Sequence, residues 1–148
     1  MENKKLLNIA VVLSFYGVIM LFLFAFLYII QGSFLSYHED FMGITANDVE
    51  AFNPELLVLV GVFIRLIGFS LLFIGVADVI ILLTWFRDGD KKGWFIQLMI
   101  LVLLLIPFMI LTGIVGIDKA PFIASVSVFI VSSIAQIIAA KPALSKKP

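Results

Sequence analysis

His38, Glu39 and Asp40 are neighbours whose side chains could bind a metal ion or exchange a proton. Imidazole and carboxylate groups serve both purposes in proteins. Adjacent residues of a coil or strand point in different directions, however, and the chain has no second histidine and no cysteine to complete a zinc or iron site. We therefore expect no metal site, no cofactor and no catalytic residue here. The segment is interpreted as a solvated loop, with a pH-sensitive or partner-contacting loop as the alternative.

Arg65 and Asp78 are two charged residues inside a long apolar stretch. A charge at mid-bilayer costs about 2.5–3.5 kcal/mol on insertion scales, so such residues normally face a partner or water. They are thirteen positions apart, about 20 Å along a helix and about 140° around it, so they cannot pair with each other. Arg65 is twenty residues from Trp85 and could extend to the outer interface or to acidic loop residues. Recognition of an anionic ligand is its alternative role.

Asp78 is seven residues from Trp85, about 10 Å below the inner boundary, and its side chain is too short to reach water. Burial there favours the neutral acid, so we expect a protonated Asp78 that donates a hydrogen bond between helices. A proton or cation relay is the alternative. The polar groups expected at the same depth lie on the first and fourth apolar stretches: Ser14, Tyr16, Ser132, Ser133 and Gln136.

The chain around these residues is unusually apolar. Of its 148 residues, 63% are hydrophobic and 14% are charged, against about 25% charged in ordinary globular proteins. Ten basic residues balance ten acidic ones, which argues against a nucleic-acid surface. Four stretches reach the length of about 20 residues that a helix needs to cross a bilayer. They predict an all-α membrane protein, a bundle of four transmembrane helices in a single domain, with spans at 6–30, 56–86, 94–115 and 121–140.

The first apolar stretch could also be a secretory signal peptide. Its apolar run is longer than the roughly 7–15 residues of a signal core, and no small-x-small cleavage site follows. We therefore interpret it as a membrane anchor.

The orientation follows from the cations. Trp85 and Trp94 are expected at a headgroup boundary, with Gly89 and Gly93 available for the tight turn between them. With four spans, this turn shares one side with both termini, including the tail 141–148. Eight cations fall on that side and only Lys119 on the other, so the positive-inside rule predicts a multi-pass protein of the cell membrane with cytoplasmic termini. The eight are Lys4, Lys5, Arg87, Lys91, Lys92, Lys141, Lys146 and Lys147.

Residues 31–55 form the largest segment between spans and are expected outside the cytoplasm. They contain five carboxylates and no Lys or Arg. Thr45, followed three residues later by Asp48, resembles a capping box and predicts a short helix from about Ala46 to Phe52. The candidate contact residues of this loop are His38, Glu39, Asp40, Asp48 and Glu50.

Small residues indicate where the helices approach one another. Gly61, Gly68 and Gly75 share one side of the second span, and small side chains let backbones pack closely in lipid. Ser125, Ser132 and Ala139 recur every seven residues on the fourth span, beside Gln136, and should face inward. The third span is the most uniformly apolar and should expose the most surface to lipid, with a kink at Pro107.

Three motifs lie between residues 43 and 95: GITANDVEAFNPELL, IRLIGFSLLFIG and FRDGDKKGWF. Together they resemble a pattern found in uncharacterised small four-span prokaryotic membrane proteins. The resemblance covers about a third of the chain. It implies four membrane helices and no assigned activity, and it supplies no catalytic residue.

These observations favour a protein that acts through protein or lipid contacts, in an accessory, assembly or sensor role. Its expected partners are the bilayer and a membrane protein or a second copy of the chain. The alternative is an oligomeric transporter of a small solute, ion or proton that uses Asp78 and Arg65. Small multidrug exporters are similar in size, but they use an acid in the first span and 6–30 contains none. A lipid- or quinone-modifying enzyme would need a reactive constellation that one histidine and scattered carboxylates do not provide.

Overall fold

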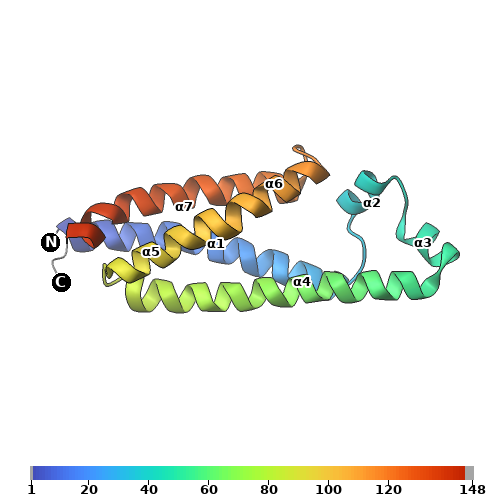
Figure 1. The fold of residues 1–148 in the computed structure, drawn as a ribbon, viewed down its shortest axis with the longest axis horizontal. Coiled ribbons are helices and arrows are strands. Elements are labelled where there is room, and N and C mark those ends of the chain that lie inside the picture. Colours follow the sequence, from blue (N-terminus) through green and yellow to red (C-terminus); the bar gives the residue numbers. More distant parts are fainter. Residues whose placement is uncertain (1, 146–148) are drawn as a thin grey trace. The chain divides into compact units, whose positions relative to one another are not determined.

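The structure, a computed structural model, describes residues 2–145 (Figure 1). Every regular element in this part of the chain is a helix. Two π-helical segments, η1 and η2, interrupt the α-helices. In chain order the elements are α1 (Glu2–Gln31), α2 (Ser36–Met42), α3 (Ala46–Phe52), α4 (Pro54–Ile81), η1 (Leu82–Phe86), α5 (Lys91–Met99), η2 (Ile100–Leu105), α6 (Ile106–Val115) and α7 (Ala120–Ser145).

Four helices within residues 2–145 are long and apolar enough to cross a membrane, which confirms the predicted all-helical class and the number of long apolar helices. They run over Asn3–Gln31, Pro54–Phe86, Lys91–Val115 and Ala120–Ser145. Each extends beyond the apolar stretch that predicted it, because backbone hydrogen bonding continues a helix through polar residues. Lys146 and Lys147, counted among the cations of the predicted tail, lie outside the described residues.

The helices belong to two compact units. The large unit contains Met1–Met20 and Gly75–Pro148, and the small unit contains Leu21–Ile74. α1 and α4 therefore each contribute one part to either unit. The division separates the two charged residues of α4, because Arg65 belongs to the small unit and Asp78 to the large one.

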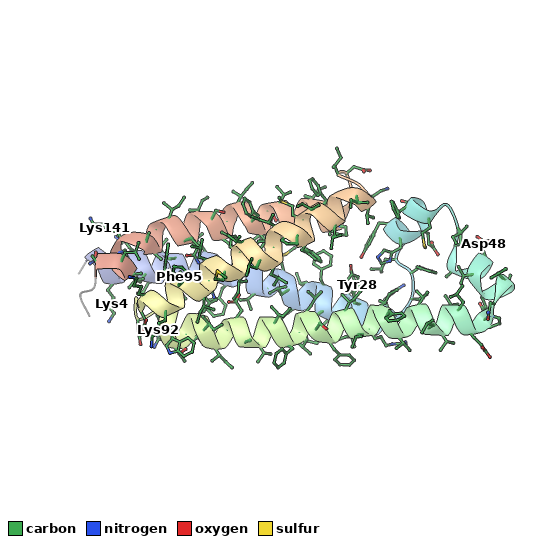
Figure 2. The ribbon with its side chains drawn as sticks, viewed as in Figure 1. Lys4, Tyr28, Asp48, Lys92, Phe95 and Lys141 are labelled. Atoms are coloured by element: carbon green, nitrogen blue, oxygen red, sulfur yellow. The ribbon has the colours of Figure 1, made fainter. Side chains whose placement is uncertain are left out.

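In the large unit the first part of α1 packs against α7 through small residues. A Cβ atom at Gly17 would lie 3.3 Å from Cγ1 of Val128 and 3.5 Å from Oγ of Ser132. Ala135 and Ala139 of α7 are fully buried. The stripe predicted from Ser125, Ala139 and Gln136 is indeed buried, with Ser132 half-buried beside it. In Figure 2, Lys4, Lys92 and Lys141 lie at the same end of this unit.

The turn between α4 and α5 uses its two glycines differently. Gly89 has a φ of 66°, in the left-handed region that glycine adopts without strain. Gly93 is helical, and a Cβ there would lie 2.6 Å from the backbone nitrogen of Phe86, so Gly93 allows close packing of the two chain segments. Asp90 caps α5, because its side chain accepts a hydrogen bond from the Lys92 amide at 2.7 Å.

The π-helical segment η2 ends at Leu105, two residues before Pro107. Proline lacks the amide hydrogen that would bond to the carbonyl four residues earlier, here that of Leu103, which lies in η2. Wider π-type winding is a common way for a helix to accommodate such a break. The kink expected at Pro107 stays a prediction.

In the small unit the end of α1 lies directly on α4. A Cβ atom at Gly68 would lie 2.9 Å from the carbonyl oxygen of Ala25 and 3.0 Å from the amide nitrogen of Ile29. The backbones are in contact here, as the glycine pattern predicted. Ala25 and Tyr28 of α1 pack with Ile64 and Leu71 of α4 to form the core of the unit.

α3 begins and ends where the capping box predicted. Thr45 is its N-cap and accepts a hydrogen bond from the Asp48 amide at 3.2 Å, while the Asp48 side chain accepts one from the Thr45 amide at 2.7 Å. Glu39 of α2 accepts a hydrogen bond from the Ala46 amide at 2.9 Å. The bond between Ala46 and Glu39 links the two short helices, so residues 36–52 form a folded segment.

Candidate functional site

Asp78 is buried in the large unit, with 6% of its surface exposed, and its Oδ1 accepts a hydrogen bond from Nε2 of Gln97 on α5. Gln97 is equally buried. The prediction that Asp78 makes a buried bond between helices agrees with this contact. The donor expected from the sequence was Asp78 itself, whereas here Gln97 donates. An amide carries both donors and an acceptor, so Gln97 can serve a neutral or an ionised carboxyl group.

Gln97 was not among the predicted partners, which were sought on the first and fourth spans. Gln97 stands only three residues after Trp94 in the sequence. The midpoint between Asp78 and Gln97 falls between Arg87 and Asp88, inside the turn, as expected for facing positions in an antiparallel pair.

Of the polar residues predicted on the first and fourth spans, Tyr16 makes a side-chain hydrogen bond between the two helices. The hydroxyl groups of Tyr16 and Ser127 share a hydrogen bond of 2.8 Å between α1 and α7. Ser14 is buried, and Ser132 lies near Gly17. Thr112 and Ser125 form a further buried hydroxyl pair, 3.1 Å apart, between α6 and α7. The large unit therefore contains several separate polar links between helices.

The backbone and the side chain of Gln136 have different surroundings in the interior of the large unit. Its backbone carbonyl accepts a hydrogen bond from Nε1 of Trp94 at 3.1 Å, so this indole joins α5 to α7. Its side chain is buried, and within residues 2–145 no donor reaches its Oε1 atom. Trp85, the matching tryptophan across the turn, is 47% exposed. The two tryptophans of the turn thus have different surroundings despite their symmetrical spacing.

Arg65 is exposed, and its guanidinium group lies against the backbone of Gly32, in the place that a side chain at residue 32 would occupy. Its Nη1 atom is also 3.6 Å from the position of a Cβ at Gly61. Gly32 follows the last residue of α1, where the carbonyl groups give a helix a partial negative charge. The structure therefore places the cation beside a helix C-terminus.

Two of the loop carboxylates bond within their own segment, and the tie between Arg65 and the loop carboxylates stays a prediction. Glu39 and Asp48 accept bonds from Ala46 and Thr45. Hydrogen bonds from the amide and the hydroxyl of Thr45 lower the pKa of Asp48. Asp40 and Glu50 are exposed. In the described part of the chain, no three His, Asp or Glu side chains gather closely enough to hold a metal ion.

His38 is surrounded by aromatic rings. Tyr37 contacts it edge-on at a centroid distance of 4.3 Å, Tyr28 stacks on it at 6.3 Å, and Phe34 approaches edge-on at 6.4 Å. Its Nδ1 atom accepts a hydrogen bond from the Leu35 amide at 3.1 Å. Burial lowers the pKa of His38, which favours the neutral ring with its proton on Nε2.

Tyr28 and Tyr37 share a hydrogen bond of 2.7 Å between their hydroxyl groups, which links α1 to α2. Burial raises the pKa of Tyr37, and the bond to Tyr28 raises it further. Neither tyrosine was among the predicted site residues. Their spacing of nine residues, across the end of an apolar helix, carries no recognisable signal, because the turn at Gly32 and Ser33 brings them together.

A pocket of about 250 Å³ opens beside His38 in the small unit. Its walls come from two segments, 34–42 and 60–64. Every wall residue except His38 is apolar, and Phe41 and Phe63 are more than half exposed. The lining residues are Phe34, His38, Phe41, Met42, Val60, Phe63 and Ile64.

Comparisons with protein-family models, with curated proteins and with solved structures found no match to this chain. The resemblance of residues 43–95 to small four-span membrane proteins therefore stays a prediction.

Proposed function

We propose that the chain is an integral membrane protein that acts through contacts with another membrane protein or with lipid, in an accessory, assembly or sensor role. Residues 31–55 would lie outside the cytoplasm, and both termini with the Trp85–Phe95 turn would lie inside. Four apolar helices of sufficient length support the membrane location. The gathering of Lys4, Lys92 and Lys141 at one end of the large unit supports the orientation.

The observation that carries the proposed contact role is the folded segment 36–52. One hydrogen bond, from the Ala46 amide to Glu39, joins α2 to α3, and the capping bonds between Thr45 and Asp48 hold the start of α3. Large apolar side chains remain on its outside, with Phe52 84% exposed and Phe41 55% exposed. Apolar groups held on a folded segment mark contact surfaces with proteins or membranes more often than solvated loops do.

Photo-crosslinking in native membranes tests this role. A photoreactive amino acid at Phe52 should capture a specific membrane protein or lipid, identified by mass spectrometry after purification in mild detergent. Ile117 is the matched control, because it is an exposed apolar residue in the turn between α6 and α7, which is predicted to lie on the same side. Equal capture patterns at both positions, or none at Phe52, would contradict the proposal.

The chain contains no cysteine, so single cysteines can report the orientation. A membrane-impermeant maleimide should label Asn47→Cys in intact cells and Lys91→Cys only after permeabilisation. Both positions are exposed. Labelling of Lys91→Cys in intact cells would reverse the proposed orientation.

Transport is the second candidate function, favoured by one observation: a buried carboxyl group, Asp78, within an apolar span. Intramembrane acids often belong to proton or ion pathways. Purified protein in liposomes should then show a flux that Asp78→Asn abolishes without loss of folding. Such a flux, with no partner captured at Phe52, would place transport ahead of the contact role.

A further inference from the structure

The pocket of the small unit has the chemistry of a site for part of an amphiphilic molecule. Its volume of about 250 Å³ lies just below the range of roughly 300–1,000 Å³ that encloses whole small ligands. Phe34, Val60 and Ile64 give it apolar walls. The exposed rings of Phe41 and Phe63 show that it opens to the surface, so a longer molecule could insert one section and leave the rest outside.

His38 adds one hydrogen-bond donor to these walls. Because Nδ1 already accepts from the Leu35 amide, the neutral ring carries its proton on Nε2. A carbonyl oxygen at the opening of the pocket would be an acceptor for this donor.

Arg65 adds a cation at the same level. Its guanidinium group lies beside Gly61, in the same turn of α4 as the wall residues Val60 and Ile64, and against Gly32, two residues before Phe34. A guanidinium group binds phosphate through paired, charge-assisted hydrogen bonds.

The position of these groups along α4 matches a membrane interface. Trp85 is twenty residues after Arg65, which is about 30 Å of helix and equals the thickness of the hydrocarbon core. If Trp85 stands at one boundary, the backbone of Arg65 stands at the other, and its guanidinium group extends outward to Gly61, into the interfacial layer that contains the glycerol esters and phosphates of phospholipids.

We propose that this pocket binds an anionic glycerophospholipid, with the first methylene groups of one acyl chain between Phe34 and Ile64, an ester carbonyl accepting from Nε2 of His38, and the phosphate on Arg65. The site rests on the membrane location proposed above and deepens the contact role, since it gives the lipid contact a chemical class.

Native mass spectrometry of the full-length protein, titrated with phosphatidylglycerol or phosphatidylcholine in neutral detergent, tests the site. One phosphatidylglycerol should remain bound per chain, about tenfold more tightly than phosphatidylcholine, as expected for a charge-assisted contact. Arg65→Gln should remove this preference, whereas Arg87→Gln, which removes a cation from the other unit, should not. Free glycerol phosphate should not compete, because it lacks the acyl chain.

The apolar part of the site has its own matched pair. Val60→Trp should fill the pocket and abolish retention of both lipids, while Phe73→Trp, at a 76% exposed position of α4, should leave retention unchanged. A phosphatidylglycerol with a photoreactive group near the ester should crosslink the wild type within 34–42 or 60–64. This measurement does not depend on the folding of any variant.

Equal binding of the two lipids, unchanged binding by Arg65→Gln, or crosslinks confined to other segments would overturn the proposed site. These results are distinguishable from failure of the proposed function. Membrane integration is measured separately by resistance to extraction with alkaline carbonate, and partner capture is measured at Phe52.

Discussion

The two units hold their helices together by different means. In the large unit, side-chain hydrogen bonds join the helices, as between Asp78 and Gln97 or Tyr16 and Ser127. In the small unit, the backbones of α1 and α4 touch at Gly68, and aromatic rings fill the space around His38. In the membrane location proposed above, lipid as apolar as leucine would remove the usual hydrophobic drive between helices, and close packing and polar bonds would replace it. One chain therefore uses polar bonds in its large unit and close packing in its small unit.

The difference has a functional consequence. In the large unit, the hydrogen bond between α4 and α5 occupies Asp78 and Gln97. The aromatic interior of the small unit instead leaves a pocket with one donor and one nearby cation. We therefore expect ligand contacts in the small unit and mainly structural roles for the polar residues of the large one.

The largest effect should come from Gly68→Ala, which tests whether backbone contact stabilises the small unit. The added Cβ would lie within 3.0 Å of backbone atoms of Ala25 and Ile29, which cannot rotate away. We expect a loss of about 2–3 kcal/mol in the free energy of unfolding, despite the better helix propensity of alanine. Denaturant titration in detergent measures it.

Gly113→Ala is the control for this change. Its Cβ would meet only the ring of Phe122, at 3.1 Å, and a side chain can shift. We expect stability within about 1 kcal/mol of the wild type. Similar losses for the two variants would contradict the contrast between the units.

A smaller effect should follow from Gln97→Leu, which leaves the buried Asp78 without its donor. We expect a loss of about 1–3 kcal/mol, the cost of an unsatisfied buried polar group. The double variant Asp78→Leu/Gln97→Leu should recover most of this loss, because both polar groups are then removed. Thermal unfolding of the two single variants and the double variant measures the coupling. Purely additive losses would show that the pair does not join α4 to α5.

The smallest effect concerns His38 and tests whether the aromatic rings of the small unit shield its imidazole from water. Burial lowers its pKa, so the folded protein favours the neutral ring. This preference for the neutral ring contributes to the free energy of unfolding. The contribution is fully present above pH 6.5, the ordinary pKa, and is lost as the pH falls from 6.5 through the lower pKa of the folded state. As the chain has one histidine, its imidazole NMR signals report the titration directly. A midpoint at or above 6.5 in lipid-free detergent would contradict the aromatic enclosure.

The sequence predicted features that depend on local chemistry. The capping box of Thr45 and Asp48 specified α3, because the hydrogen bonds of a cap form between residues three positions apart. Gly61 and Gly68 indicated the close face of α4, since their spacing places them on one side of a helix. The partner of Asp78 was not predicted, because its contact with Gln97 depends on how α5 packs against α4.

The sequence by itself determined the all-helical class, the four apolar helices and the short helix α3, since hydropathy, helix length and capping depend on residues that are close along the chain. Tertiary structure alone decided that Gln97 meets Asp78, that Arg65 lies on Gly32 at the end of α1, and that Tyr28, Tyr37 and His38 enclose one another. These contacts depend on the rotation of each helix about its axis and on the path of each turn, which packing fixes after the helices have formed.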